Sequence, residues 1–175
     1  MSDNGRIAIL LGANLLLFFA VGEINNLLSG WSIHLHLDAL LVVFFGLFLK
    51  RISSLLYTAL LGFLADALHP VPVGTYAAAY ILLWLFFVWC QRRIRRQNPL
   101  HVRTVAAVGQ LLLLTGLTLL TSRTLLLDAL FWQRIGVEIL LSCLVVLLCA
   151  SFWCRFQKNL LHAMGWDLEA QMSPL

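Results

Sequence analysis

The chain has 175 residues, of which 61% are hydrophobic and 11% charged, and its mean hydropathy is +0.91. Eight acidic and twelve basic residues are too few to cover the surface of a water-soluble domain of this length. The net charge of +4 does not indicate a nucleic-acid binder, because the basic residues stand between apolar runs and not on a polar face. The composition excludes a soluble globular protein and predicts a single integral-membrane domain.

Apolar runs divide the chain into six segments that we predict to be transmembrane helices. Crossing a hydrocarbon core about 30 Å thick takes about 20 mostly apolar residues in a helix, so a chain of this length leaves little room for anything else. We therefore expect an all-α fold, a compact bundle of six membrane-spanning helices. The predicted spans are residues 7–28, 33–49, 52–68, 73–90, 104–121 and 135–154.

The distribution of Lys and Arg predicts the orientation of this bundle. Loops on one side of the predicted spans hold ten of these residues, and loops on the other side hold two. Under the positive-inside rule both termini and the loop after the fourth span are cytoplasmic. The basic run in that loop, which we expect to lie against anionic lipid headgroups, contains Arg92, Arg93, Arg95 and Arg96.

The residues after the sixth span allow two interpretations. Trp153, Phe156, Leu160 and Met164 recur at helical spacing, with basic residues between them. This pattern is typical of a short helix lying in the membrane interface, over about residues 155–166. A continuation of the sixth span beyond residue 154 accounts for the same pattern.

Four acidic residues fall near the same ends of the predicted spans, which places them in the outer leaflet. They are Glu23, Asp38, Asp66 and Glu138. Ionisable groups at such depth are costly unless they face a cavity or one another, so they form a candidate site, with Arg123 and Arg134 as possible counter-ions. The alternative is that each acid is simply solvated near a helix end.

Other polar residues do not indicate a catalytic or metal site. The segment from His34 to Asp38 places His34, His36 and Asp38 at alternate positions, but metal-binding histidines on a helix are spaced i and i+4. We expect the hydroxyl of Ser142 to bond to its own helix backbone. No nucleophile and base are placed together, so we expect a non-enzymatic protein without a metal or cofactor.

The residues from Gly62 to Tyr76 form a more specific pattern, in which Gly-x-x-x-Asp is followed by a short turn and a glycine that opens the next helix. Gly62 can let the third helix approach a neighbour closely, and Gly74 can supply a positive φ. Asp66 can accept hydrogen bonds from the first amides of the fourth helix, or it can contact a partner. The Pro-rich turn that ends at Pro72 restricts how the chain leaves the third helix.

This pattern, the chain length and the basic loop after the fourth span resemble the MreD family, with a turn at Pro70 to Pro72 stiffer than expected there. The resemblance implies a multi-pass, non-enzymatic protein of the bacterial inner membrane, part of the cell-elongation machinery. It also implies association with MreC and, through MreC, with MreB, RodA and the elongation-specific transpeptidase.

A second interpretation comes from a different class of protein. The substrate-binding component of an energy-coupling vitamin transporter is similar in being a compact bundle of six membrane helices. The outer acids would then line a ligand pocket, and Ala8 and Gly12 would resemble the small-residue contact that such components make with a coupling partner. The loop at residues 29–32 is short for a lid over a ligand.

Overall fold

The computed structural model describes residues 3–31, 33–49, 51–69, 71–91, 93, 98–121 and 129–165, and every regular element among them is helical. The all-α prediction is therefore confirmed for the described residues. The elements in chain order are α1 (Asp3–Leu28), the short 3-10 helix η1 (Ser29–Trp31), α2 (Asp38–Phe48), α3 (Arg51–Leu68), α4 (Thr75–Gln91), α5 (Pro99–Thr121) and α6 (Ala129–Ala163).

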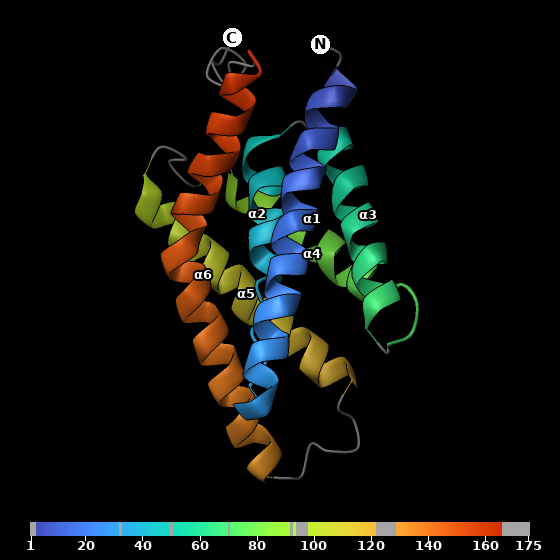
Figure 1. Ribbon diagram of the computed structural model, residues 1–175, viewed down its shortest axis with the longest axis vertical. Coiled ribbons are helices and arrows are strands. Elements are labelled where there is room, and N and C mark those ends of the chain that lie inside the picture. Colours follow the sequence, from blue (N-terminus) through green and yellow to red (C-terminus); the bar gives the residue numbers. More distant parts are fainter. Residues whose placement is uncertain are drawn as a thin grey trace.

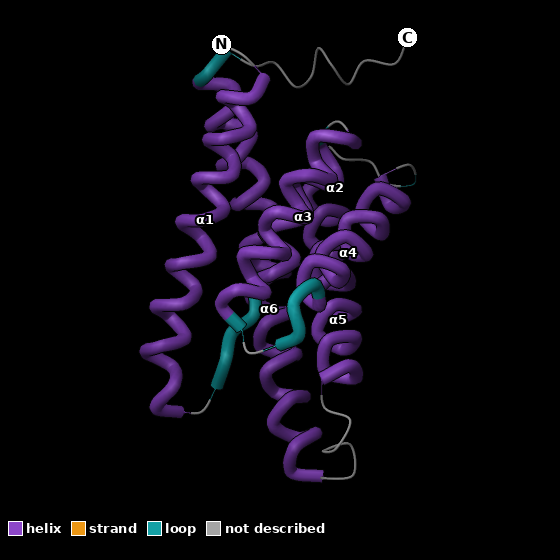
Figure 2. The backbone as a smooth tube through the Cα atoms, turned by 90° about the vertical axis from the view of Figure 1, so that its right-hand side faces the viewer, coloured by secondary structure: helices purple, strands orange, loops and turns teal. Residues whose placement is uncertain are grey.

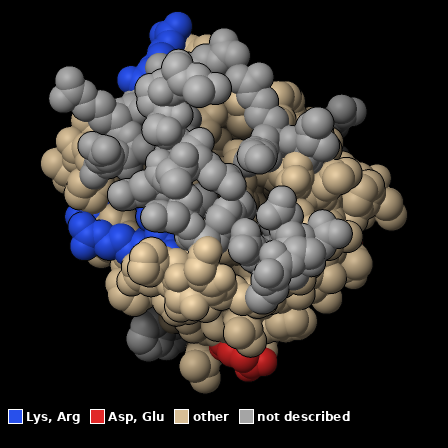
Figure 3. All heavy atoms as spheres, turned by 90° about the horizontal axis from the view of Figure 1, so that it is seen from above, with Lys and Arg blue, Asp and Glu red and all other residues tan. Residues whose placement is uncertain are grey.

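The first turn of α1 and the last turn of α6 lie at the same end of the bundle, which we call the termini end (Figure 1). The last turn of α1 and the first turn of α6 lie at the opposite end. Helix α5 crosses the bundle obliquely, and α1 stands apart from α3, α4 and α5 along one side (Figure 2). The described Arg93, which follows α4, and Arg155, in the last turns of α6, are both exposed. Seen from the termini end, basic side chains reach the rim of the surface (Figure 3).

Helix α2 is the centre of the fold. It contacts α1, α3, α4, α5 and α6, and all eleven of its residues are buried. Its sequence after Asp38 is an unbroken apolar run, and a helix that is apolar on every side is stable only when it is surrounded. At 1.5 Å per residue, eleven residues reach about 16 Å, which is about half of a hydrocarbon core.

The predicted second span, residues 33–49, is therefore wrong over its first five residues. Residues 33–37 are not helical, and α2 begins only at Asp38. Most of these residues are apolar, but polar side chains of α1 and α6 bind their backbone and keep it out of the helix, as described below. The consequence is a helix that begins inside the bundle.

Residues 155–163 continue α6 and do not form a separate helix, so the second interpretation holds for them, and Trp166 lies outside the described residues. Helix α6 runs without interruption to Ala163. Its last turns still pack against the bundle, because Cys154, Gln157 and Leu161 are buried there. This contact with the bundle keeps the last turns in line with the rest of α6.

Three helices are long and apolar enough to cross a membrane, namely Ala8–Leu28, Pro99–Leu120 and Phe131–Ala163. Helices α2, α3 and α4 are apolar but shorter. The side of α6 exposes a continuous apolar stripe, with Leu140 and Phe152 each 71% exposed. These features identify a helical membrane protein, since water does not tolerate so much apolar side surface. Crossing of the membrane by each of the six helices remains a prediction, as does the cytoplasmic position of both termini.

Candidate functional site

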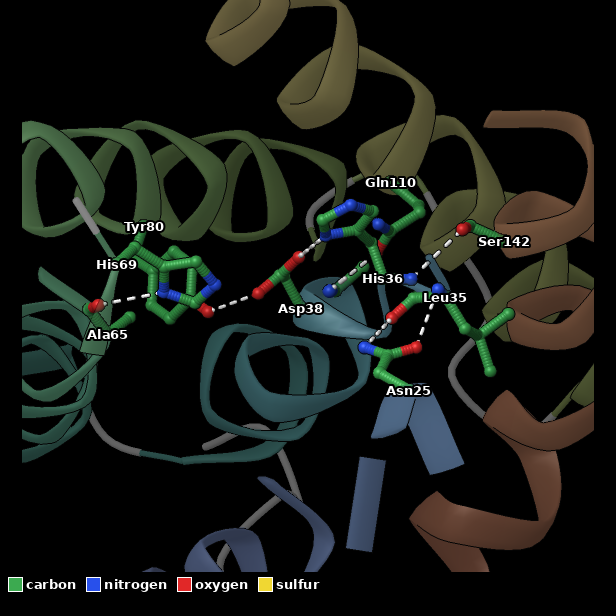
Figure 4. Close-up of polar contacts among 10 residues, drawn as sticks. Asn25, Leu35, His36, Asp38, Ala65, His69, Tyr80, Gln110 and Ser142 are labelled. Atoms are coloured by element: carbon green, nitrogen blue, oxygen red, sulfur yellow. Dashed lines mark hydrogen bonds and ion pairs between the residues drawn. The ribbon is translucent and has the colours of Figure 1, made fainter. Parts of the chain in front are cut away.

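The non-helical segment before α2 lies inside the bundle, and side chains from other helices bind its backbone (Figure 4). Asn25 of α1 binds Leu35 twice: its Nδ2 donates to the Leu35 carbonyl at 2.9 Å, and its Oδ1 accepts from the Leu35 amide at 2.7 Å. The His36 amide donates to Ser142 Oγ of α6 at 3.0 Å. Irregular backbone at membrane depth is tolerated only where protein groups satisfy it, and here α1 and α6 do so.

One amide in the first turn of α2 is also bound from another helix. The Ala39 amide donates to Gln110 Oε1 of α5 at 2.8 Å, and Leu37, the residue before the helix, provides no side-chain cap. Gln110 is fully buried. An amide from α5 therefore takes the place of the local Ser, Thr, Asp or Asn that normally caps a helix.

Asp38 is the charged residue at this helix start. Its Oδ1 accepts a hydrogen bond from the Tyr80 hydroxyl of α4, whereas its Oδ2 has no hydrogen-bond partner. The nearest basic group is His36, whose Nδ1 lies 3.8 Å from Oδ2. No Lys or Arg of the described residues pairs with this carboxylate, whose side chain is 10% exposed. Asp38 Oδ2 is thus a buried acceptor that faces His36 and receives no hydrogen bond.

Asp38 is among the residues that line a hollow of about 380 Å³ between α1, residues 34–38 and the end of α3. The lining includes a second acid, Glu23 of α1, together with His34, His36 and His69. Most other lining residues are apolar. The structure therefore brings Glu23 and Asp38 to one site.

The other predicted members of the polar cluster lie elsewhere. Glu138 lines a separate hollow of about 230 Å³ beside α5 and α6, and His36 borders both hollows. Arg134 is its counter-ion, with Nε 3.4 Å from Oε1, but the Arg134 side chain is 56% exposed, so this pair contributes little stability. His34 Nδ1 lies 3.9 Å from the same carboxylate oxygen. Arg123 lies outside the described residues.

Asp66 belongs to neither hollow, because it fixes the corner between α3 and α4. Its Oδ2 accepts hydrogen bonds from the amides of Gly74 and Ala77, at 2.9 and 3.3 Å, and its Oδ1 accepts one from the Tyr76 amide at 2.7 Å. Gly74 is the residue before α4, and Tyr76 and Ala77 lie in its first turn, where backbone amides have no acceptor within the helix. The structure therefore gives Asp66 the role of a cap on α4.

Glycine is required at two positions of this corner. Gly74 has a φ of +95°, a conformation that other residues rarely adopt. A Cβ on Gly62 would lie 2.5 Å from Ala77 Cα, so only glycine lets α3 and α4 approach this closely. The Pro72 carbonyl accepts from the Thr75 amide at 3.2 Å and completes the turn. Each residue of the predicted motif thus has a structural role.

Helix α4 connects this corner to the hollow. The amide of Tyr76 binds Asp66, and one turn later the hydroxyl of Tyr80 binds Asp38. The two tyrosine rings pack edge to face, and the Tyr76 ring also lies 4.6 Å from the His69 ring. The orientation of α4 that Asp66 fixes therefore also places the hydroxyl that holds Asp38.

Sequence reasoning missed Asn25, Tyr80 and Gln110, and it assigned Ser142 the wrong partner, since its hydroxyl binds the His36 amide. The available signal was an amide side chain within an apolar run, as at Gln110, whereas Asn25 stands beside the polar Glu23 and Asn26. Among the described residues, no group of three or more His, Cys, Asp or Glu side chains is placed to hold a metal ion.

Arg93 is the described member of the predicted basic loop. It is exposed, and its guanidinium carbon lies 4.4 Å from the centre of the Trp89 ring, an arrangement typical of a cation–π contact. Arg92, Arg95 and Arg96 lie outside the described residues. Comparisons with protein-family models, curated proteins and solved structures find no match to this chain. The family resemblance therefore stays a prediction, and the function has to be argued from the geometry.

Proposed function

We propose that this chain is a non-enzymatic scaffold of the cell-elongation complex in the bacterial inner membrane, with direct binding to MreC. MreB, RodA and the elongation-specific transpeptidase are proposed partners within the same complex. The observation that carries the proposal is the corner between α3 and α4. The resemblance rests on three residues that meet there: Gly62 allows the close approach of α3 and α4, Asp66 caps α4, and Gly74 adopts a positive φ.

Exposed apolar faces support lateral contact with partner helices. The stripe on α6 includes Leu140, Leu144 and Leu148, and α1 exposes Leu16 and Phe19 on a helix that stands apart from much of the bundle. An apolar helix face can contact either lipid or a partner helix, because both are apolar. Close packing between the helices decides which contact forms in a membrane. We propose that one of these two faces binds MreC.

Site-specific photo-crosslinking in cells tests this contact. A photoreactive amino acid at Leu16 on α1 and one at Leu144 on α6 sample the two faces, because both side chains are more than half exposed. We expect a crosslink to MreC from one position and not from the other, so that each position serves as the control for its counterpart. Absence of an MreC crosslink from every exposed position on α1 and α6 would contradict direct binding through these faces.

Depletion of the protein in its native bacterium tests the function itself. We expect rod-shaped cells to become round, with or without vitamins in a minimal medium, and the wild-type gene to restore the rod. Unchanged shape after depletion would refute the elongation function.

The hollow beside α2 favours the second candidate, the substrate-binding component of an energy-coupling vitamin transporter. A half-length helix that begins inside a bundle is a feature of membrane proteins that bind ligands near the bilayer midplane. The face at Ala8 and Gly12 supports this candidate too, because Ala8 is exposed and no atom lies within 4 Å of a Cβ placed on Gly12. Normal cell shape with growth restored by a single vitamin is the result expected for this candidate.

A further inference from the structure

A basic cluster lies where α5 and α6 pack together, toward the termini end of the bundle. Arg103 stands in the second turn of α5, and its Nε donates to Ser151 Oγ of α6 at 2.7 Å. Ser151 is buried, and the Arg103 side chain is partly buried. A neighbouring helix therefore holds this guanidinium in place, whereas an interfacial arginine commonly extends its charged end freely into water.

The same face of α6 carries two more cations. Arg155 follows Ser151 by four residues, and Lys158 follows it by seven, so the three side chains lie on one side of the helix. The Arg155 side chain is exposed, and Lys158 Nζ lies 4.2 Å from the centre of the Phe48 ring. Arg155 thus stands one helical turn from the serine that holds Arg103.

The two arginines have no acidic partner among the described residues, where the ion pairs involve only Asp38 and Glu138. Glu23 and Glu138 lie toward the other end of the bundle, in the last turns of α1 and the first third of α6. From the termini end, basic side chains are seen at the rim of the surface (Figure 3). A partly buried cation that the chain itself does not neutralise favours an anionic ligand.

The cluster lies at the depth expected for phospholipid phosphates. The predicted fifth span begins at residue 104, and the predicted sixth span ends at residue 154. Arg103 and Arg155 therefore each stand one residue outside the predicted hydrocarbon core. Phospholipid headgroups occupy this layer in either leaflet, so the argument holds for either orientation of the chain.

An exposed apolar stripe continues from the cluster along α6. Phe152 precedes Arg155 by three residues, and Leu148 precedes Phe152 by four, which places them in one row on the helix surface. The Phe152 and Leu148 side chains are 71% and 60% exposed. A ligand with an anionic head and an apolar body therefore matches this face better than a soluble anion does.

We propose that Arg103 and Arg155 bind the phosphate of one anionic phospholipid, whose acyl chains lie along Phe152 and Leu148. An arginine presents a planar fork of N–H donors that matches phosphate oxygens. Ser151 accepts only from Arg103 Nε, and no group of the described residues accepts from its two terminal nitrogens. Basic pockets between membrane helices bind anionic headgroups in this way. The site is separate from the basic run at residues 92–96 and does not depend on the scaffold function.

Native mass spectrometry of the full chain tests the proposal, with the protein in a neutral detergent and titrated with phosphatidylglycerol. We expect one phosphatidylglycerol to be retained at saturation, and phosphatidylcholine, which carries its own cation, to bind about fivefold more weakly. Glycerol phosphate is the soluble probe, because it has the phosphate without the acyl chains. Equal retention of the two lipids, or equal affinity for glycerol phosphate and phosphatidylglycerol, would overturn the proposal.

Arg103→Gln and Arg155→Gln each remove one positive charge from the site. We expect each variant to bind phosphatidylglycerol about fivefold more weakly, the factor that one basic residue near anionic lipid contributes. Arg103→Lys keeps the charge but loses the planar fork, so it should recover only part of the affinity. Arg155→Gln keeps the test decisive if Arg103→Gln does not fold, because an exposed side chain contributes little to stability.

Arg93→Gln and Arg134→Gln are the matched controls, since each removes the same charge outside the site. Arg93 is exposed after α4, on the same predicted side of the membrane, and Arg134 is exposed near the start of α6. Both should bind phosphatidylglycerol as the wild type does. A loss in Arg93→Gln equal to that in Arg155→Gln would show a diffuse attraction and would overturn the site. Undiminished binding in folded Arg155→Gln would do the same, whatever the outcome of the cell-shape assay.

Discussion

Asp66→Ala is predicted to destabilise the protein strongly, because it removes the acceptor of three backbone amides at one corner. Two of these hydrogen bonds, from Tyr76 and Ala77, are buried, and the third, from Gly74, is partly buried. A buried donor left without a partner costs about 1–3 kcal/mol. The bond from Ala77 is long at 3.3 Å and contributes least. Release of the carboxylate's own desolvation offsets part of the loss, so we expect a net cost of about 3 kcal/mol.

The free energy of unfolding is measured on the purified chain in mixed micelles, by titration with a denaturing detergent. Asp66→Asn should fall between wild type and Asp66→Ala, since the amide keeps one acceptor oxygen and turns a donor toward the remaining amides. Glu23→Ala is the control, because it removes an exposed carboxylate, and surface changes alter stability by about 0.5 kcal/mol or less. An Asp66→Ala cost no larger than that of Glu23→Ala would refute the cap. If such a variant also lost its crosslink to MreC, Asp66 would be a contact residue.

Three further predictions concern the packing, the break before α2 and the orientation. Gly62→Ala should lower the free energy of unfolding by about 1–3 kcal/mol, because the new Cβ would meet backbone atoms of α4. Gly12→Ala is the control and should leave it nearly unchanged, because the space around that Cβ is open. Equal effects of the two substitutions would contradict the close approach of α3 and α4. Gln110→Leu should lower the free energy of unfolding by about 1–3 kcal/mol in the same titration, because the Ala39 amide loses its hydrogen-bond acceptor. Gln133→Leu, at an exposed position, is the control. Equal costs would mean that another group accepts the hydrogen bond of the Ala39 amide. Val73 is 87% exposed in the turn before α4. In a variant without other cysteines, Val73→Cys should react with a membrane-impermeant maleimide added from the periplasmic side. Reaction only after lysis would reverse the predicted orientation.

The elements that sequence predicted well are those whose causes are local. The third and fourth spans were predicted at residues 52–68 and 73–90, and the helices are Arg51–Leu68 and Thr75–Gln91. Charged and Pro-rich segments mark their ends, and such boundaries need no knowledge of the rest of the fold. The cap was predictable for the same reason, because Asp66 and the amides it binds are only 8 to 11 residues apart.

The break before α2 was not predictable from local sequence. Residues 33–37 are Ile-His-Leu-His-Leu and lead directly into the apolar run of α2, so the local sequence predicts one longer helix. Its backbone is bound by Asn25, 10 residues away, and by Ser142, 106 residues away, while Gln110, 71 residues away, binds the first turn of α2. These bonds exist only once α1, α5 and α6 surround the segment.

Composition and local spacing thus determined that this chain is helical and apolar, where most of its helices end, and how α3 turns into α4. Only the tertiary structure decided that α2 starts inside the bundle and that Asp38 lies buried with one oxygen that accepts no hydrogen bond. The physical reason is that burial of apolar surface depends mainly on composition, whereas a backbone leaves the helix inside a membrane protein only where distant polar groups replace its lost hydrogen bonds.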